Sequence, residues 1–254
     1  MNTLIAFYQN IGPALSLLVF LTFLLAGAVK GVIGLGLPTI AMGLLGLAMA
    51  PAQAAALLIV PSTLTNLWQL AAGGHLLALL RRLGPMLVMI VLGTLLGSAW
   101  LGINNGPWAA QALGAALLAY SVYGLVGRGF QVPPAWEVWL GPVCGLVTGV
   151  VTAATGVFVM PAVPFLQSLG LSRDEMIQAL GLSFTVSTLA LAVGLAGQDA
   201  LGGQALGASL LMLAPALLGM LAGQWLRQRI SAALFKRCFF VGLAVLGGHL
   251  LVNG

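Results

Sequence analysis

Long apolar runs without charged side chains dominate this chain. Leaving histidine aside, no charged residue occurs in residues 31–80, 83–127 or 138–172. A helix that crosses a bilayer needs roughly 20 predominantly apolar residues. Each run is therefore long enough for more than one crossing, and the pattern predicts a chain built almost entirely of transmembrane helices.

Glycine, proline, asparagine and charged residues interrupt these runs and divide the first half of the chain into elements. We expect a broken segment over about residues 11–50, interrupted around residues 31–38, and then three helices. These helices are expected over about residues 51–72, 85–102 and 107–126. A loop that contains Arg81 and Arg82 would separate the first two of them.

The same order of elements returns after a linker at residues 127–134. A second broken segment over about residues 136–169 is interrupted near residues 152–156. Three more helices are expected over about residues 175–196 and 205–226 and in a last stretch that ends near residue 252. This order indicates an internal duplication, with repeats at residues 1–130 and 131–254 of one membrane domain.

The charges of the corresponding loops indicate how the two repeats are oriented. After the second element, the first repeat carries Arg81 and Arg82, whereas the second repeat carries Asp199. After the third element, the loop at residues 104–105 is neutral, whereas residues 227–237 hold four basic side chains. Positively charged loops stay in the cytoplasm. Corresponding loops would therefore face opposite sides of the membrane, as in the inverted repeats of many transporters.

The predicted sides of the loops are mutually consistent only if each broken segment begins and ends on the same side of the membrane. The trailing legs, about residues 38–50 and 156–169, are roughly 20 Å long at 1.5 Å per residue. The hydrocarbon core is about 30 Å thick. We therefore expect an all-α integral membrane protein whose two inverted repeats each contain a broken, re-entrant helical hairpin and three transmembrane helices. Two complete short helices per hairpin are the alternative, and both termini are expected outside.

Composition excludes a soluble protein and most enzymes. Hydrophobic residues make up 61% of the chain and charged residues 5%, whereas a soluble domain has about 25% charged residues. The net charge of +5 comes from residues at helix ends and gives topology information rather than a nucleic-acid patch. No phosphate-binding loop, nucleophile–base pair or His/Cys metal cluster occurs in the sequence. We expect no enzyme activity, no cofactor and no metal, in a bacterial cytoplasmic (inner) membrane.

Two glycine-rich stretches carry a resemblance to a known family. Residues 26–38 (AGAVKGVIGLGLP) and 145–156 (GLVTGVVTAATG) resemble the repeated first-helix motif of the TauE/SafE family, also called the sulfite exporter family. Residues 51–54 and 171–175 resemble the turns that follow this motif. The resemblance covers nearly the whole chain. It implies a transporter of sulfite, organosulfonates or other small organic anions.

Lys30 is the most informative single residue, because a charged side chain inside a span costs several kcal/mol unless it is paired or hydrated. It lies beside the break at Gly34 and Gly36, where helix ends expose unpaired N–H groups. A cation and such N–H groups suit a carboxylate or sulfonate. The favoured interpretation is an anion ligand. The alternatives are a side chain that reaches the cytoplasmic interface and a structural ion pair.

Polar residues on the second helix of each half complete the predicted site. Ser62, Asn66 and Gln69 share one helix face, and Ser183 and Ser187 lie at matching places in the second half. They could hydrogen-bond an anion, or they could hold helices together. The candidate substrate-binding residues are therefore Lys30, Gly34, Gly36, Ser62, Asn66, Gln69, Thr155, Gly156, Ser183 and Ser187.

The favoured function is a secondary transporter that exports small sulfur-containing or organic anions such as sulfite or sulfonates. It would use alternating access around a site near the bilayer midplane. The alternatives are a non-transporting membrane scaffold or assembly subunit and a carrier of non-sulfur carboxylates. The expected partners are a small anion and the lipid bilayer, but not nucleic acid. Glycine pairs at residues 93/97 and 219/223 suit packing within the chain or a homodimer.

Overall fold

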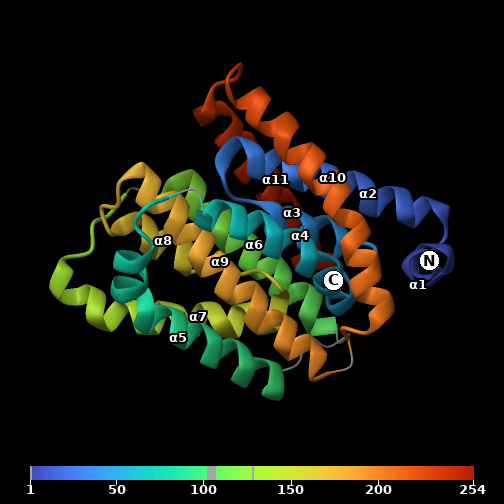
Figure 1. Ribbon diagram of the computed structural model, residues 1–254, viewed down its shortest axis with the longest axis horizontal. Helices are drawn as coiled ribbons and strands as arrows, with labels where there is room; N and C mark the ends of the chain where they lie inside the picture. Colours follow the sequence, from blue (N-terminus) through green and yellow to red (C-terminus); the bar gives the residue numbers. More distant parts are fainter. Residues whose placement is uncertain (1, 72, 102–106, 128, 199) are drawn as a thin grey trace.

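The computed structural model is an all-helical bundle (Figure 1), described for residues 2–71, 73–101, 107–127, 129–198 and 200–254; these residues contain no strand. The helices are α1 (Asn2–Ile11), α2 (Pro13–Ile33), α3 (Leu37–Leu45), α4 (Pro51–Ala71), α5 (Leu76–Trp100), α6 (Pro107–Val126), α7 (Pro134–Thr155), α8 (Ala162–Ser168), α9 (Arg173–Ala196), α10 (Gly203–Arg227) and α11 (Ala232–Asn253). The predicted all-α membrane class is confirmed.

Among the residues that the structure describes, eight helices are long and apolar enough to cross a membrane, and the chain is a multi-pass membrane protein. They are α2, α4, α5, α6, α7, α9, α10 and α11. Helix α3 has 9 residues and α8 has 7. At 1.5 Å per residue they reach about 14 Å and about 10 Å, less than half of a bilayer core.

Glycines with left-handed backbone conformations make the breaks that precede α3 and α8. Helix α2 ends at Gly34 (φ 77°), and α3 begins after Gly36 (φ 106°). Helix α7 ends at Gly156 (φ 70°). Only glycine adopts these φ values at no steric cost, so the chain can leave each helix sharply. Both predicted interruptions are confirmed.

Two close helix pairs, α2 with α10 and α5 with α7, hold the bundle together through glycine. A Cβ atom on Gly27 would lie 2.1 Å from the carbonyl oxygen of Ala216, and one on Gly31 would lie 2.2 Å from that of Met220. Helices α2 and α10 therefore touch through their backbones and run parallel. Gly93 makes the same kind of contact between α5 and α7, 2.4 Å from a carbonyl oxygen. The small-residue faces are used inside the chain, and they give no support to a homodimer.

Two further helix pairs run antiparallel. In the pair α4 and α9, the hydroxyls of Ser62 and Thr188 are 3.1 Å apart, and Gly181 lies against Leu70 further along. In the pair α6 and α11, contacts join residue 114 to 247 and residue 124 to 240. Each pair joins helices that hold the same place in the element order of the two halves.

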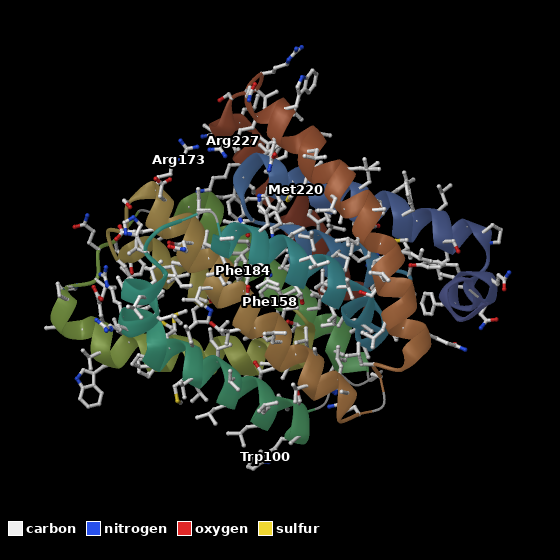
Figure 2. All side chains as sticks on the ribbon, in the orientation of Figure 1. Trp100, Phe158, Arg173, Phe184, Met220 and Arg227 are labelled. Atoms are coloured by element: carbon white, nitrogen blue, oxygen red, sulfur yellow. The ribbon has the colours of Figure 1, made fainter. Side chains whose placement is uncertain are left out.

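The two ends of the bundle differ in charge. Arg173 begins α9 and Arg227 ends α10, and Figure 2 shows both side chains at one end of the molecule. Trp100, at the end of α5, lies at the opposite end and is 89% exposed. A contact of Gln178 with the peptide N–H of His75 brings the start of α5 to the Arg173 end. The basic side chains at the start of α9 and the end of α10 therefore gather at one end of the bundle.

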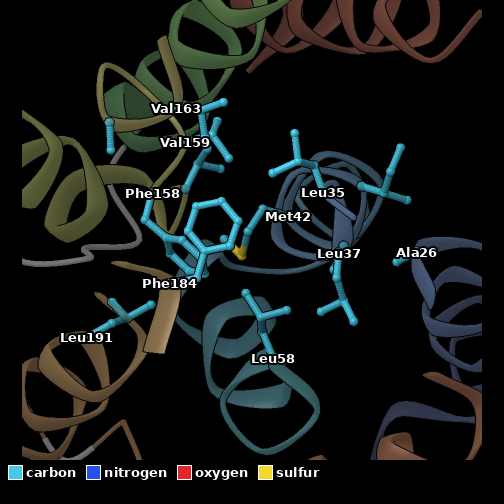
Figure 3. Close-up of a cluster of buried hydrophobic side chains, with 14 of the residues drawn as sticks. Ala26, Leu35, Leu37, Met42, Leu58, Phe158, Val159, Val163, Phe184 and Leu191 are labelled. Carbon is cyan, nitrogen blue, oxygen red and sulfur yellow. The ribbon is translucent and has the colours of Figure 1, made fainter. Parts of the chain in front are cut away.

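Apolar side chains from both broken segments meet in the centre of the bundle (Figure 3). Met42 of α3 lies against the second break, since its methyl carbon would be 2.8 Å from a Cβ atom on Gly156. The rings of Phe158 and Phe184 pack 5.3 Å apart beside it. All three large side chains are buried. The second break is therefore closed by a solid apolar layer.

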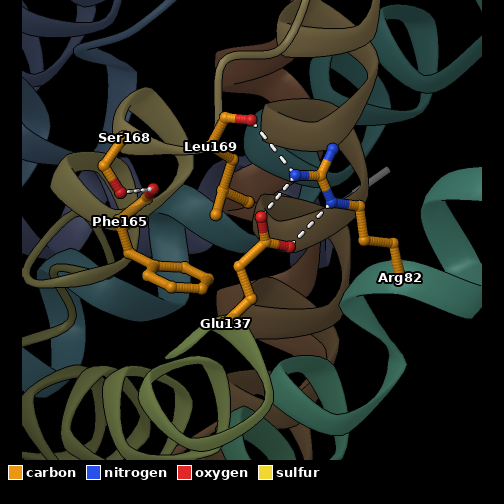
Figure 4. Close-up of polar contacts among 5 residues, drawn as sticks. All are labelled: Arg82, Glu137, Phe165, Ser168 and Leu169. Atoms are coloured by element: carbon orange, nitrogen blue, oxygen red, sulfur yellow. Dashed lines mark hydrogen bonds and ion pairs between the residues drawn. The ribbon is translucent and has the colours of Figure 1, made fainter. Parts of the chain in front are cut away.

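The structure corrects the predicted start of one helix. The sequence pattern places Arg81 and Arg82 in a loop and begins the next helix at Pro85, but both arginines and Pro85 lie inside α5. Membrane helices tolerate interior proline because neighbouring groups satisfy the freed carbonyl. Figure 4 shows Arg82 in a two-contact ion pair with Glu137 of α7, at 2.9 and 2.6 Å. Arg82 also donates to the carbonyl of Leu169, just beyond α8. The sequence pattern also gave no indication of helix α1.

Candidate functional site

Lys30 of α2 reaches across to α4. Its ammonium group donates hydrogen bonds to Thr65 Oγ1 at 3.0 Å and to Asn66 Oδ1. Both acceptors are already oriented by α4 itself: Thr65 donates to the carbonyl of Pro61 at 2.7 Å, and Asn66 Nδ2 donates to Ser62 Oγ at 3.1 Å. Each therefore presents an oxygen lone pair rather than an N–H or O–H group to the cation.

Pro61 explains why α4 can offer this arrangement. Proline lacks an N–H, so the carbonyl of Leu57 loses its helical partner. Ser209 of α10 replaces that partner by donating to the Leu57 carbonyl at 2.7 Å, and it accepts from the N–H of Val60 at 3.0 Å. Pro61 therefore removes one backbone hydrogen bond from α4 about one turn before Thr65, and Ser209 of α10 replaces it.

The Lys30 side chain is buried, with 3% of its surface exposed. It therefore does not extend to the membrane surface. No carboxylate pairs with it in the part of the chain that the structure describes, where Arg82 and Glu137 form the one ion pair found. An ammonium has three N–H donors, and two are used. A buried cation without a counter-charge and with one donor still open is what an anionic ligand would complete.

Gln69 joins α4 to the first break. Its Nε2 donates to the carbonyl of Gly34 at 2.8 Å, at the point where α2 ends. Its Oε1 is buried and has no hydrogen-bond partner in the described structure. The side chain fixes the end of α2 close to the Lys30 network. Gly36 is buried against Val29 and Phe239 and directly precedes α3.

A cavity of about 690 Å³ opens over Lys30. Lys30, Gly34 and Gln69 line it, together with the aromatic side chains of Trp68 and Tyr120. Its lining residues come from the ends of α2, α4, α6, α8 and α10, from the starts of α9 and α11, and from the segment that follows α6, so the cavity is at the charged end of the bundle.

The cavity is cationic. Besides Lys30, its lining contains Arg173, Arg227 and Lys236, and the described lining residues include no aspartate or glutamate. The three outer side chains are exposed. The acidic residues nearest to Arg173 along the chain are Asp174 and Glu175, and Glu175 closes a capping box with Ser172 at the start of α9. The field inside the cavity therefore favours anions.

The remaining predicted residues lie away from this cavity. Asn66 does not line the cavity but accepts a hydrogen bond directly from Lys30, and Ser62 is connected to Lys30 through Asn66. Thr155 donates to the carbonyl of Val151 and accepts from the N–H of Val157, so its hydroxyl spans the second break. Gly156 is buried beneath the apolar layer.

Ser183 and Ser187 are fully buried on α9, and neither hydroxyl has a hydrogen-bond partner in the described structure. A buried polar group without a partner costs roughly 1–3 kcal/mol. The hydroxyl of Tyr120 is in the same condition, and Tyr120 lines the cavity.

Sequence reasoning missed several residues that line or support the cavity. Tyr120 is one of several polar side chains on α6, which also carries Gln111, Ser121 and Tyr123, and the sequence pattern does not single it out. Arg173, Arg227 and Lys236 resemble ordinary charges at helix ends. Only the fold shows that Tyr120 and these three cations surround one cavity. Within the described residues, no group of three or more His, Cys, Asp or Glu side chains could hold a metal ion.

Comparison with known proteins gives one result. The sequence profile described as sulfite exporter TauE/SafE matches residues 19–250, nearly the whole chain. No curated protein and no solved structure shows a significant match.

Proposed function

The chain belongs to the TauE/SafE family of sulfite exporters, and from this membership we propose that it is a secondary transporter that exports small sulfur-containing or organic anions, such as sulfite or sulfonates. The observation that carries the proposal is Lys30: a buried ammonium with an open donor, in a cavity lined by cations. An oxyanion would supply the missing charge and accept the open hydrogen bond.

We further propose that the two halves are inverted repeats that exchange conformations around this site. In support, α4 and α9 run antiparallel, as do α6 and α11, although each pair occupies equivalent places in the two halves. The pairing of α2 with α10 has its counterpart in the pairing of α5 with α7. Short α3 and α8 would then be the returning legs of re-entrant hairpins.

The asymmetry between the two breaks supports alternating access. The first break faces a wide cavity, where Gly34 is partly exposed. The second break is sealed beneath Met42, Phe158 and Phe184. With the basic end in the cytoplasm, this conformation is open to the inside and both termini lie outside. The membrane would be the bacterial cytoplasmic membrane.

Binding and transport test this function together. The purified protein in nanodiscs is screened for thermal stabilisation by sulfite, sulfoacetate, taurine, thiosulfate and small carboxylates, because a ligand of the native state stabilises it by RT ln(1 + [L]/Kd). Anions that bind are then followed in efflux from proteoliposomes. Stabilisation by carboxylates alone would move the substrate class away from sulfur. Absence of stabilisation by every anion would overturn the proposal.

Two threonines on α4 provide a matched pair of variants. Thr65 and Thr63 both donate to a carbonyl four residues back, at 2.7 Å, but only Thr65 contacts Lys30. We expect Thr65→Val to weaken anion binding by about tenfold, because the ammonium of Lys30 loses one of the two acceptors that hold it in position. Thr63→Val should leave binding unchanged. Equal effects of the two variants would show that the Lys30 network has no special role.

A further inference from the structure

The cavity has cations at two depths. Lys30 is buried at its base and held by α4. Arg173, Arg227 and Lys236 line the mouth of the same cavity and are exposed. In the described structure none of these three forms an ion pair, and Lys236 lies 5.8 Å from the Phe240 ring centroid. Their charges are therefore free to act on a passing solute.

We propose that Arg173, Arg227 and Lys236 form a capture site, here called the mouth cations, that attracts an anion from the cytoplasm and delivers it to Lys30. This inference rests on the proposed function and assigns different roles to the cations at the two depths. The mouth cations set how fast an anion enters, and Lys30 sets how long it stays.

The physical basis is the difference in exposure. Charges in water act over a Debye length, which is about 30 Å at 10 mM salt and about 3 Å at 1 M. The mouth cations are exposed, so salt screens their attraction. Lys30 is buried, and a direct contact with an anion is screened far less. A concave surface lined by one sign of charge raises association rates by 10- to 1,000-fold.

Two other arginines near the mouth provide a control. Arg229 and Arg237 are on the same side and close in sequence to Arg227 and Lys236, but they do not line the cavity. The guanidinium of Arg229 instead stacks on Trp225, 4.1 Å from the ring centroid. If the basic residues serve only to fix topology, neutralising either set should have the same effect.

The test measures the association rate of anions by stopped-flow tryptophan fluorescence, since Trp68 lines the cavity. The protein is held in phosphatidylcholine nanodiscs, whose lipids carry no net charge. The probes are sulfoacetate, with two negative charges, and methanesulfonate, with one. We expect the combined change Arg173→Gln, Arg227→Gln and Lys236→Gln to slow sulfoacetate association on the order of tenfold at about 10 mM salt, and less than twofold at about 1 M. Methanesulfonate should be affected less.

The dissociation rate should remain that of the wild type, and so should the transport kcat, with the apparent KM raised. Arg229→Gln with Arg237→Gln should change association by less than twofold. Arg227→Lys, which keeps the charge, should behave as the wild type. The inference is overturned if the mouth variant associates as fast as the wild type at low salt, or if the control pair slows association equally. If wild-type protein binds neither probe, nor any other anion, the proposed function itself fails.

Discussion

Replacing Lys30 with methionine should abolish anion binding while leaving the protein folded. Methionine is unbranched and of similar length, so Lys30→Met removes the charge and little volume. The ammonium contributes a charge-assisted hydrogen bond, worth about 1.5–3 kcal/mol. Its Coulomb attraction for an anion about 4 Å away is about 4 kcal/mol at an effective dielectric constant of 20. These two quantities overlap, so a loss of about 3 kcal/mol or more is expected, which raises Kd more than about 100-fold.

The effect on stability should be small, because two contributions oppose each other. Removing a buried cation without a carboxylate partner relieves its desolvation cost. The same change leaves Asn66 Oδ1 without the donor that it has in the structure, at a cost of about 1–3 kcal/mol. The free energy of unfolding without ligand should therefore change by less than about 2 kcal/mol, and binding can be measured separately.

The assay is isothermal titration calorimetry in nanodiscs, with the melting temperature of the ligand-free protein recorded for each variant. Lys30→Arg, which keeps a cation at the same position, serves as the control and should retain measurable affinity. The reasoning is refuted if Lys30→Met binds anions within about threefold of the wild type while it remains folded. It is also refuted if Lys30→Met loses binding only because it unfolds.

Three further predictions concern packing and topology. Gly219→Ala should reduce the free energy of unfolding by roughly 1–3 kcal/mol through overpacking, and so lower the melting temperature, because its Cβ would lie 2.0 Å from a backbone carbonyl oxygen of α2. Gly84→Ala, whose Cβ would meet nothing within 4 Å, should be neutral or stabilising. Equal losses of stability in the two variants would contradict the close approach of the helices. Ser209→Ala should destabilise by about 1–3 kcal/mol, since the carbonyl freed by proline in α4 would lose its donor, and an unchanged melting curve would remove that role. In a cysteine-free background, Ser231→Cys should be labelled only from the cytoplasm and Asn253→Cys only from outside; labelling of both from one side would refute the assigned topology.

The sequence anticipated the breaks because their cause is local. Gly34 and Gly36 can adopt positive φ and Pro38 donates no backbone N–H, so this stretch favours the end of a helix, and the structure has α2 ending at Gly34 and α3 beginning after Gly36. The same reasoning was wrong at Pro85, where the helix continues. There the outcome depends on neighbours that satisfy the freed carbonyl, and the residues near Pro85 do not reveal them.

The sequence also identified Lys30 as a charged side chain whose burial in a membrane span is energetically unfavourable, but it did not distinguish between the three interpretations of this residue. Reaching the interface, pairing with a carboxylate and binding an anion all begin from the same side chain. The packing of α2 beside α4 brings Lys30 to Thr65 and Asn66 and leaves it buried. That contact joins residues about 35 positions apart, so no local pattern predicts it.

By itself, the sequence determined the environment and the elements of this protein: long uncharged runs require a membrane, and glycine and proline set where helices stop. Family membership was also legible in the glycine-rich motifs, and the family profile covers residues 19–250. The tertiary structure alone decided which charges share a cavity. Arg173, Arg227 and Lys236 lie on three different helices, and only the packing of these helices brings the three charges to the cavity that Lys30 lines. The glycine contacts between α2 and α10 set how closely the helix of Arg227 approaches that of Lys30. The hydropathy of each residue can be read from the sequence alone, whereas the electrostatic field of a cavity depends on the positions of all its charges in the folded protein.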